Sequence, residues 1–227
     1  MTTDLHDGFY VAADDQPRML LVEAIDNNDI AFLNRELDFL HDNAGVPFAF
    51  AGVLIEDWFR DLTPWPSAPV MGKESFGDRA PDTLDRITGE IVPYMEEHFP
   101  ALKGKCRIIG GYSLAGLFSL WAGYECDAFD GVSAASPSVW YPGWMEYARN
   151  HGMRAKAVYL SLGDAEPGAR NKTVATVGNA ILEQACLLSA QGVESTMVWN
   201  AGNHFNEADI RTAKAFQWVM ERFSVER

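Results

Sequence analysis

The chain of 227 residues is 48% hydrophobic and 22% charged, which is typical of an ordinary globular protein. Its length and the lack of a linker-like segment predict a single domain over residues 1–227. The charge is unusual, because 18 Lys and Arg residues against 32 Asp and Glu residues leave a net charge of −14. Since such a surface repels phosphate backbones and anionic lipid headgroups, we expect no nucleic-acid partner and no membrane surface as a partner.

The N-terminal residues and the cysteines both bear on the compartment. Residues 1–8 have neither the basic nor the apolar segment of a secretory signal, and no run of about 18 apolar residues predicts a membrane span. Cys106, Cys126 and Cys186 are odd in number and lack the spacing of a metal site or a redox pair, so we expect reduced thiols. These features predict a cytoplasmic protein.

Apolar runs alternate with helical patterns along the chain. In the first half, the expected elements are a strand at Met19–Ile25, a helix with its stripe at Ile30, Leu33, Leu37 and Leu40, a strand at residues 48–55, a loop rich in Pro and Trp at residues 57–66, and a helix marked by Leu84, Ile87 and Ile91. In the second half, they are strands at residues 106–110, 132–135, 157–163 and 195–199, a buried helix at residues 114–124, a helix with its stripe at Val174, Val177, Ile181, Ala185 and Leu188, and a last helix at Phe216, Val219, Met220 and Phe223 that Asn206 and Asp209 would cap. This alternation predicts an α/β fold with a mostly parallel sheet covered by helices on both faces.

In such sheets the chemistry lies beyond the carboxyl ends of the strands. The loop after the strand at residues 106–110 reads Gly110-Gly111-Tyr112-Ser113-Leu114-Ala115-Gly116 and leads directly into the buried helix. Small residues around Ser113 suit a nucleophile on a sharp strand-to-helix turn, although Ala115 stands where Gly is usual. The N–H of Leu114 would then lie beside a developing oxyanion.

A glycine-rich turn of this kind also occurs in nucleotide-binding sites. The dinucleotide fingerprint needs Gly-x-Gly-x-x-Gly and an acidic residue at the end of the next strand. Here Tyr112 or Ser113 stands at the third position and the next strand ends at Ala135-Ser136, so the sequence favours a nucleophile over a cofactor site.

A serine needs a histidine base and an acid that orients it, in the chain order Ser, acid, His for α/β-hydrolases. The strand at residues 157–163 is followed by Asp164 and Glu166, and the last strand is followed by His204. Both loops belong at the same edge of the sheet as Ser113. We therefore predict a triad of Ser113, His204 and Glu166, with Asp164 as the alternative acid.

The chain also resembles the esterase D and enterochelin-esterase-like branch of the α/β-hydrolases, which includes S-formylglutathione hydrolases. The segments that carry this resemblance are Arg60-Asp61-Leu62-Thr63-Pro64, Glu90-Ile91-Val92-Pro93-Tyr94-Met95-Glu96, Gly111-Tyr112-Ser113-Leu114-Ala115-Gly116, Ala135-Ser136-Pro137-Ser138-Val139-Trp140, Gly163-Asp164-Ala165-Glu166 and Gly202-Asn203-His204-Phe205. The resemblance implies ester hydrolysis by a Ser-His-acid triad without a metal or an organic cofactor. It also implies an oxyanion donor after an early strand, where Asn27 or Asn28 stands in place of the family's glycine.

The remaining expectations concern the substrate side of the site. Trp65 and Trp140 are candidates for the pocket wall, or for packing at its rim. Arg60 is a candidate for binding an acidic group of the substrate, or for an ion pair with Asp57 or Asp61.

The predicted protein is thus a serine esterase acting on a small-molecule ester; the alternatives are an acyltransferase with the same triad and a non-catalytic binding protein of this fold. Because the chain begins late compared with long hydrolases, we expect little room for the first two antiparallel strands or for a lid, and an open site. The charge of −14 predicts a preference for neutral or cationic esters, unless Arg60 reaches the site.

Overall fold

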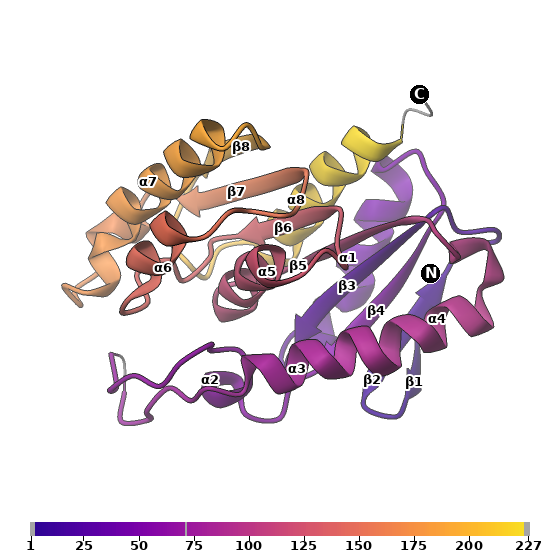
Figure 1. The fold of residues 1–227 in the computed structure, drawn as a ribbon, viewed down its shortest axis with the longest axis horizontal. Helices are drawn as coiled ribbons and strands as arrows, with labels where there is room; N and C mark the ends of the chain where they lie inside the picture. The colour runs from indigo at the N-terminus through magenta and orange to yellow at the C-terminus, as the bar shows by residue number, and fades with distance from the viewer. Residues whose placement is uncertain (1–2, 71, 225–227) are drawn as a thin grey trace.

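The computed structural model describes residues 3–70 and 72–224. Its strands form one eight-stranded sheet in the order β1-β2-β4-β3-β5-β6-β7-β8 (Figure 1). The strands are β1 (Asp4–His6), β2 (Phe9–Ala13), β3 (Met19–Ile25), β4 (Phe48–Leu54), β5 (Cys106–Tyr112), β6 (Gly131–Ala135), β7 (Ala157–Gly163) and β8 (Glu194–Asn200). The neighbouring strands β4, β3, β5, β6, β7 and β8 all pair in parallel, so the predicted mostly parallel sheet is confirmed.

Helices lie in the connections that follow β3 to β7, and α8 follows the last strand. They are α1 (Ile30–Asn43), α2 (Trp58–Asp61), α3 (Ala80–Arg86), α4 (Val92–His98), α5 (Leu114–Glu125), α6 (Trp144–Asn150), α7 (Val177–Ala190) and α8 (Ala208–Phe223). A π-helical turn, Ile87–Ile91, joins α3 to α4 just before Pro93, which has no N–H to donate to the preceding turn. Within the described ranges, no helix has the length and apolar character needed to cross a bilayer.

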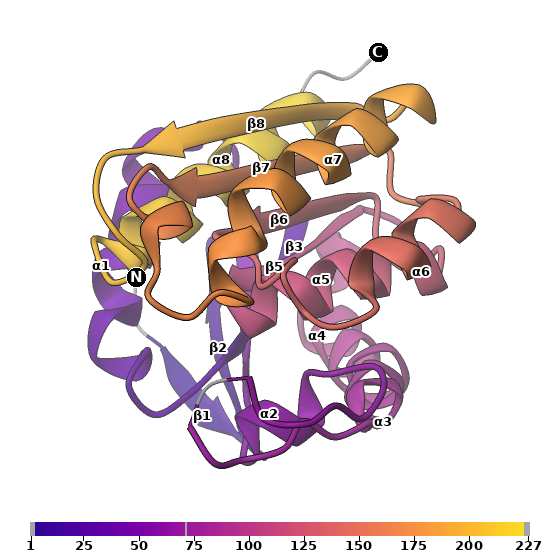
Figure 2. The same cartoon turned by 90° about the vertical axis from the view of Figure 1, so that its left-hand side faces the viewer.

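Two hydrophobic cores lie on the two faces of the sheet, and the alternation along β3 separates them. Leu20, Val22 and Ala24 point to the face covered by α5 and α7, while Leu21 and Ile25 point to the face covered by α1 and α8. Figure 2 shows α7 and α8 on opposite sides of β7. Helices therefore cover both faces, as predicted.

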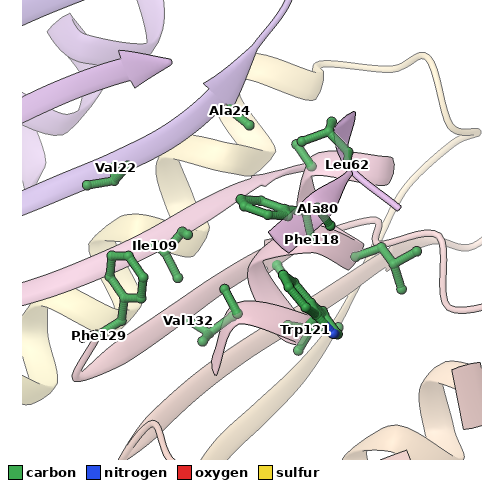
Figure 3. Close-up of a cluster of buried hydrophobic side chains, with 14 of the residues drawn as sticks. Val22, Ala24, Leu62, Ala80, Ile109, Phe118, Trp121, Phe129 and Val132 are labelled. Carbon is green, nitrogen blue, oxygen red and sulfur yellow. The ribbon is translucent and has the colours of Figure 1, made fainter. Parts of the chain in front are cut away.

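The helix α5 is the centre of the larger core. Every residue from Leu114 to Tyr124 is buried, which agrees with its apolar sequence. Figure 3 shows Phe118 and Trp121 of this helix with Ile109 of β5 and Val132 of β6 in one apolar cluster. The packing fixes α5, and with it the residue that precedes α5, against the strand ends.

The expectation that the chain has little room for the first two antiparallel strands is wrong, because both strands are present. β1 and β2 form an antiparallel hairpin, and β2 pairs with β4 at the edge of the sheet. Asp7 and Gly8 make the turn with φ of 36° and 79°, which is the two-residue Asp-Gly connection typical of tight hairpins. Both strands are short and β1 is exposed, so neither produces the long apolar run by which the other strands were predicted.

Burial within α7 provides a test of the packing. Leu188 is fully buried, whereas Leu182 of the same helix is 47% exposed. Leu188→Ala should lower the free energy of unfolding by about 2–5 kcal/mol, because it leaves a cavity in the core. Leu182→Ala, the matched control, should change it by less than about 0.5 kcal/mol. Urea unfolding measures both, and equal effects would contradict the packing described.

Candidate active site

Ser113 lies on the sharp turn between β5 and α5. Its φ of 59° and ψ of −120° are unfavourable for a residue with a side chain, so the surrounding packing must hold this conformation. A Cβ on Gly111 would lie 2.6 Å from the Cβ of Ala115. The close approach of strand and helix therefore requires glycine at position 111, and it leaves room for alanine at position 115.

Ser113, His204 and Glu166 form one hydrogen-bonded chain. His204 Nε2 lies 3.0 Å from Ser113 Oγ, and His204 Nδ1 lies 2.8 Å from Glu166 Oε2. With the proton on Nδ1, the imidazole donates to the carboxylate and accepts the Ser113 hydroxyl proton at Nε2. The three side chains come from the loops after β5, β7 and β8, because parallel strands bring their carboxyl ends to one edge of the sheet.

The environment of Glu166 stabilises its ionised form. Its Oε1 accepts hydrogen bonds from the Gly163 N–H at 2.7 Å and from the Ser136 hydroxyl at 2.8 Å. Burial raises the pKa of Glu166, but the hydrogen bond and the charge of His204, together with these two donors, outweigh burial and hold the pKa below its usual range. Glu166 is therefore an anion beside the imidazole.

Asp164, the alternative acid, does not contact His204. It is exposed, and its Oδ1 accepts the Gly202 N–H at 2.8 Å. A Cβ on Gly163 would meet the Gly202 carbonyl oxygen at 2.4 Å, so the two loops touch at glycines. Asp164 thus ties the loop after β7 to the loop that carries His204.

Arg211 of α8 anchors the loop after β8 that carries His204, which we call the histidine loop. From the sequence, Arg211 was not predicted to have this role. Its side chain is 4% exposed and donates to the carbonyl oxygens of Ala201 and Asn203 and to the Tyr112 hydroxyl. The Tyr112 hydroxyl in turn donates to the carbonyl oxygen of His204 at 2.8 Å. Arg211 Nη1 also lies 3.7 Å from Glu166 Oε1. One buried cation therefore contacts both the loop that carries Glu166 and the loop that carries His204. The available signal was a cationic residue within the apolar pattern of the last helix.

The predicted N-cap at Asn206 is wrong. The helix α8 begins at Ala208 after Glu207, which adopts a left-handed conformation. The Asn206 Oδ1 instead accepts the Asn203 N–H at 2.7 Å and shapes the turn that carries His204. A nearby backbone donor in the loop competes with the helix for this side chain.

The predicted oxyanion donors differ in their surroundings. Leu114 is the first residue of α5, where helical N–H groups have no partner within the helix. The Asn28 N–H donates to Asp26 Oδ1 at 2.6 Å and is engaged within its own loop. The Asn27 N–H has no acceptor among the residues that the structure describes. Asp26, but neither Asn27 nor Asn28, lines a cavity at Ser113.

Two cavities meet at Ser113 and His204. The first, of about 570 Å³, is lined by Trp140, Ser138, Arg170, Asn171 and Val174 among others. The second, of about 320 Å³, lies on the other side and is lined by Glu23, Asp26, Asp29, Trp58 and Tyr112 among others. Of these residues, the sequence had singled out only Trp140 as a wall of the site.

Trp65 and Arg60 lie outside both cavities. The Trp65 Nε1 donates to the Pro142 carbonyl oxygen at 2.8 Å, and the ring packs against Tyr141 and Tyr147, which is the rim packing considered above. Arg60 Nε lies 3.9 Å from Asp57 Oδ2, on a separate depression. The structure thus does not bring Arg60 to Ser113, and Arg170 is the cationic residue that lines a cavity with Ser113 instead.

The Esterase family model, described as "Putative esterase", matches residues 60–207, which is more than half of the chain. No curated protein sequence matches the chain. Among solved structures, an IroE-like serine hydrolase from Shewanella oneidensis is similar with a TM-score of 0.77 and 16% identity, over 96% of this chain and 77% of that one. The siderophore hydrolase EstB from Aspergillus nidulans has a TM-score of 0.76 and 19% identity, over 96% and 91%.

The enterobactin esterase FES from Shigella flexneri is similar with a TM-score of 0.69 and 12% identity, over 94% of this chain and 55% of that one. At these identities the likeness is one of fold. The predicted α/β-hydrolase fold and the resemblance to enterochelin-esterase-like proteins are confirmed at this level.

The lowered pKa of Glu166 predicts how stability depends on pH. Since the folded state favours the carboxylate, its contribution is present above the usual carboxyl pKa of about 4.5 and is lost as pH falls through the folded value. Glu166→Gln should therefore unfold more easily than the parent at about pH 7, and the difference should shrink at about pH 3.5. Asp164→Asn, which keeps an acceptor for Gly202, should change little at either pH. Urea unfolding at the two pH values tests this, and a constant difference for Glu166→Gln would contradict it.

Proposed function

Since the chain belongs to the Esterase family and is a carboxylic ester hydrolase, we propose that it cleaves its ester through an acyl-enzyme on Ser113. The observation that carries the proposal is the hydrogen-bonded chain from Ser113 through His204 to Glu166. In acyl-enzyme formation, Ser113 Oγ bonds to the ester carbonyl carbon while His204 Nε2 takes the hydroxyl proton. The tetrahedral intermediate then expels the alcohol, which receives that proton from His204.

Hydrolysis completes the cycle. His204 Nε2 takes a proton from water, the resulting hydroxide adds to the acyl carbon, and the carboxylic acid leaves as Ser113 Oγ regains its proton. Glu166 stays ionised throughout and stabilises the imidazolium that forms twice per cycle. Its buried donors, Gly163 and Ser136, support this role because they keep the carboxylate charged and oriented.

The oxyanion would form at the start of α5. The N–H of Leu114 and the positive end of the helix dipole stabilise negative charge there. Asn27 is our choice for the second donor, because the Asn28 N–H is engaged by Asp26. The two cavities at Ser113 would take the two arms of the ester, one on each side of the carbonyl.

The substrate is a small-molecule ester. Two of the proteins of similar fold are named as a siderophore hydrolase and an enterobactin esterase, so siderophore esters belong in the panel of substrates to be tested. Simple p-nitrophenyl esters provide the first assay, because their good leaving group makes few demands on the binding cavities.

Ser113→Ala should lower kcat for a short p-nitrophenyl ester by about 10⁴-fold or more, because the acyl-enzyme can no longer form. The matched control is Ser138→Ala, whose hydroxyl lies 3.4 Å from Ser113 Oγ. The Ser138→Ala substitution should lower kcat far less than Ser113→Ala does. A fluorophosphonate probe should still label the Ser138→Ala variant at Ser113. A Ser113→Ala protein that is as active as its parent would refute the proposal.

The identity of the acid follows from a second pair of variants. Glu166→Gln should lower kcat by about 10³–10⁴-fold, because it no longer fixes the imidazole tautomer or stabilises the imidazolium. Asp164→Asn should stay within about tenfold of the parent, since Asp164 only caps the loop that carries His204. Steady-state kinetics at neutral pH distinguishes them, and the reverse order would assign the role to Asp164.

A further inference from the structure

A third cavity, of about 200 Å³, lies behind the nucleophile between β3, α1 and α8. It shares Glu23, Asp29, Tyr112, Phe205 and Ala208 with the cavity that Ser113 and His204 line, so the two cavities adjoin at these residues. We call the third cavity the acidic cavity. Figure 1 shows β3, α1 and α8 gathered on this side of the sheet.

Two carboxyl groups, those of Glu23 and Glu36, are buried at the acidic cavity and share one hydrogen bond, in which Glu36 donates to Glu23. Glu23 of β3 points toward α1, on the face where its neighbours Leu21 and Ile25 are apolar. Glu36 occupies the inward side of α1 beside Leu37. Each glutamate is 5% exposed, and Glu23 Oε2 and Glu36 Oε1 have no hydrogen-bond partner among the described residues. A buried oxygen without a donor is costly, and more so when it is charged, so these two atoms require a partner or a proton.

The charges around the pair are mostly negative. Asp29 and Asp209 repel Glu36, and Asp29 also repels Glu23. Arg35 also lines the cavity, and it forms ion pairs with Asp209 at 3.2 Å and with Glu207 at 3.7 Å.

Burial and these like charges raise the pKa values of the acids. Burial, with the charge of Asp29, raises the pKa of Glu23 to about 8. Burial likewise raises the pKa of Asp29 to about 6, and burial and the charge of Glu23 raise that of Glu36. The cavity therefore holds protons at neutral pH, and a cation that entered would replace them.

We propose that the acidic cavity binds the ammonium group of an ester substrate that carries a primary amine, with Glu23 and Glu36 as its acceptors. This inference rests on the proposed acyl-enzyme function, because the ester carbonyl would lie at Ser113 while the amine enters the acidic cavity. An ammonium group has three donors and suits several carboxylate oxygens at once.

The walls of the acidic cavity favour an alkylammonium over a metal ion. Ile25, Phe32, Leu33 and Phe205 line it beside the carboxylates, and such apolar surfaces suit a methylene chain. Within residues 3–70 and 72–224, no group of three or more His, Cys, Asp or Glu side chains has the arrangement of a metal site. The phenyl rings add favourable cation–π contacts for an ammonium.

Direct binding tests the proposal without catalysis. Titration calorimetry of Ser113→Ala with n-butylammonium chloride should show saturable binding, whereas n-butanol should bind at least about tenfold more weakly. The affinity should rise between about pH 6 and pH 9, because the pKa of Glu23 is about 8 and only the ionised form attracts the cation. Binding should also release protons to the buffer. Equal affinity for the alcohol, or an affinity that does not rise with pH, would overturn the proposal.

Kinetics tests the same contact in the active enzyme. Two pairs of esters are needed. Within each pair, one ester ends in an ammonium group and the other in a methyl group. The first pair carries this group on the acyl arm and the second pair carries it on the alcohol arm. In one of the pairs, kcat/KM of the ammonium ester should exceed that of its neutral twin by about tenfold or more. Glu23→Gln and Glu36→Gln should each bring this ratio close to unity, because each removes one of the two carboxylate charges that attract the ammonium group.

Glu194→Gln is the matched control for net charge. Glu194 is exposed on β8, so its substitution changes the charge by the same amount without touching the acidic cavity, and the ratio should persist. A parent ratio near unity in both pairs, or a ratio that Glu194→Gln lowers as much as Glu23→Gln does, would overturn the proposal. If the parent protein hydrolyses none of the esters in a way that depends on Ser113, the proposed function is refuted instead. The binding titration then still tests whether the acidic cavity binds an ammonium group.

Discussion

The site depends on how one buried carboxylate is satisfied. Glu166 receives hydrogen bonds from the end of β7 through Gly163, from the loop after β6 through Ser136 and from the loop after β8 through His204, with Arg211 beneath it. Removing an anion from water is costly, so the fold must deliver all of these donors together. The same carboxylate thereby fixes the relative positions of three strand ends, and the geometry at Ser113 follows from it.

Glu23 and Glu36 are buried as deeply but face the opposite situation. They hydrogen-bond to each other and lie near the negative charge of Asp29, and their pKa values rise where that of Glu166 falls. Burial alone therefore does not decide the charge of a carboxyl group; the partners brought by neighbouring strands and helices do. One chain thus contains an acid whose ionised form is stabilised and a pair of acids whose protonated forms are stabilised, on either side of one histidine loop.

The strands from β3 to β8, the main helices and the hydrogen-bonded Ser113, His204 and Glu166 could be predicted because each depends on local pattern and on the shared edge of parallel strands. What was missed depends on contacts between distant segments. Arg211 and Glu23 are charged residues within apolar patterns, and only the fold reveals what they meet. Arg60 was a candidate either for binding substrate or for an ion pair with Asp57 or Asp61, and the structure places it beside Asp57 on a separate depression. The hairpin of β1 and β2 was missed because short edge strands lack a long apolar run.

The net charge of −14 acts on substrates through local geometry rather than as a uniform field. Exposed carboxylates are screened by salt within about 10 Å, so most of the 32 acids contribute little at Ser113. The two cavities at Ser113 differ in the charge of their lining residues. One is lined by the exposed Arg170, and the other is lined by Glu23 and Asp29. An ester with a basic group on one arm would therefore bind in a single orientation across the nucleophile. Charge in this protein thus bears on the direction in which a substrate lies as well as on whether it binds.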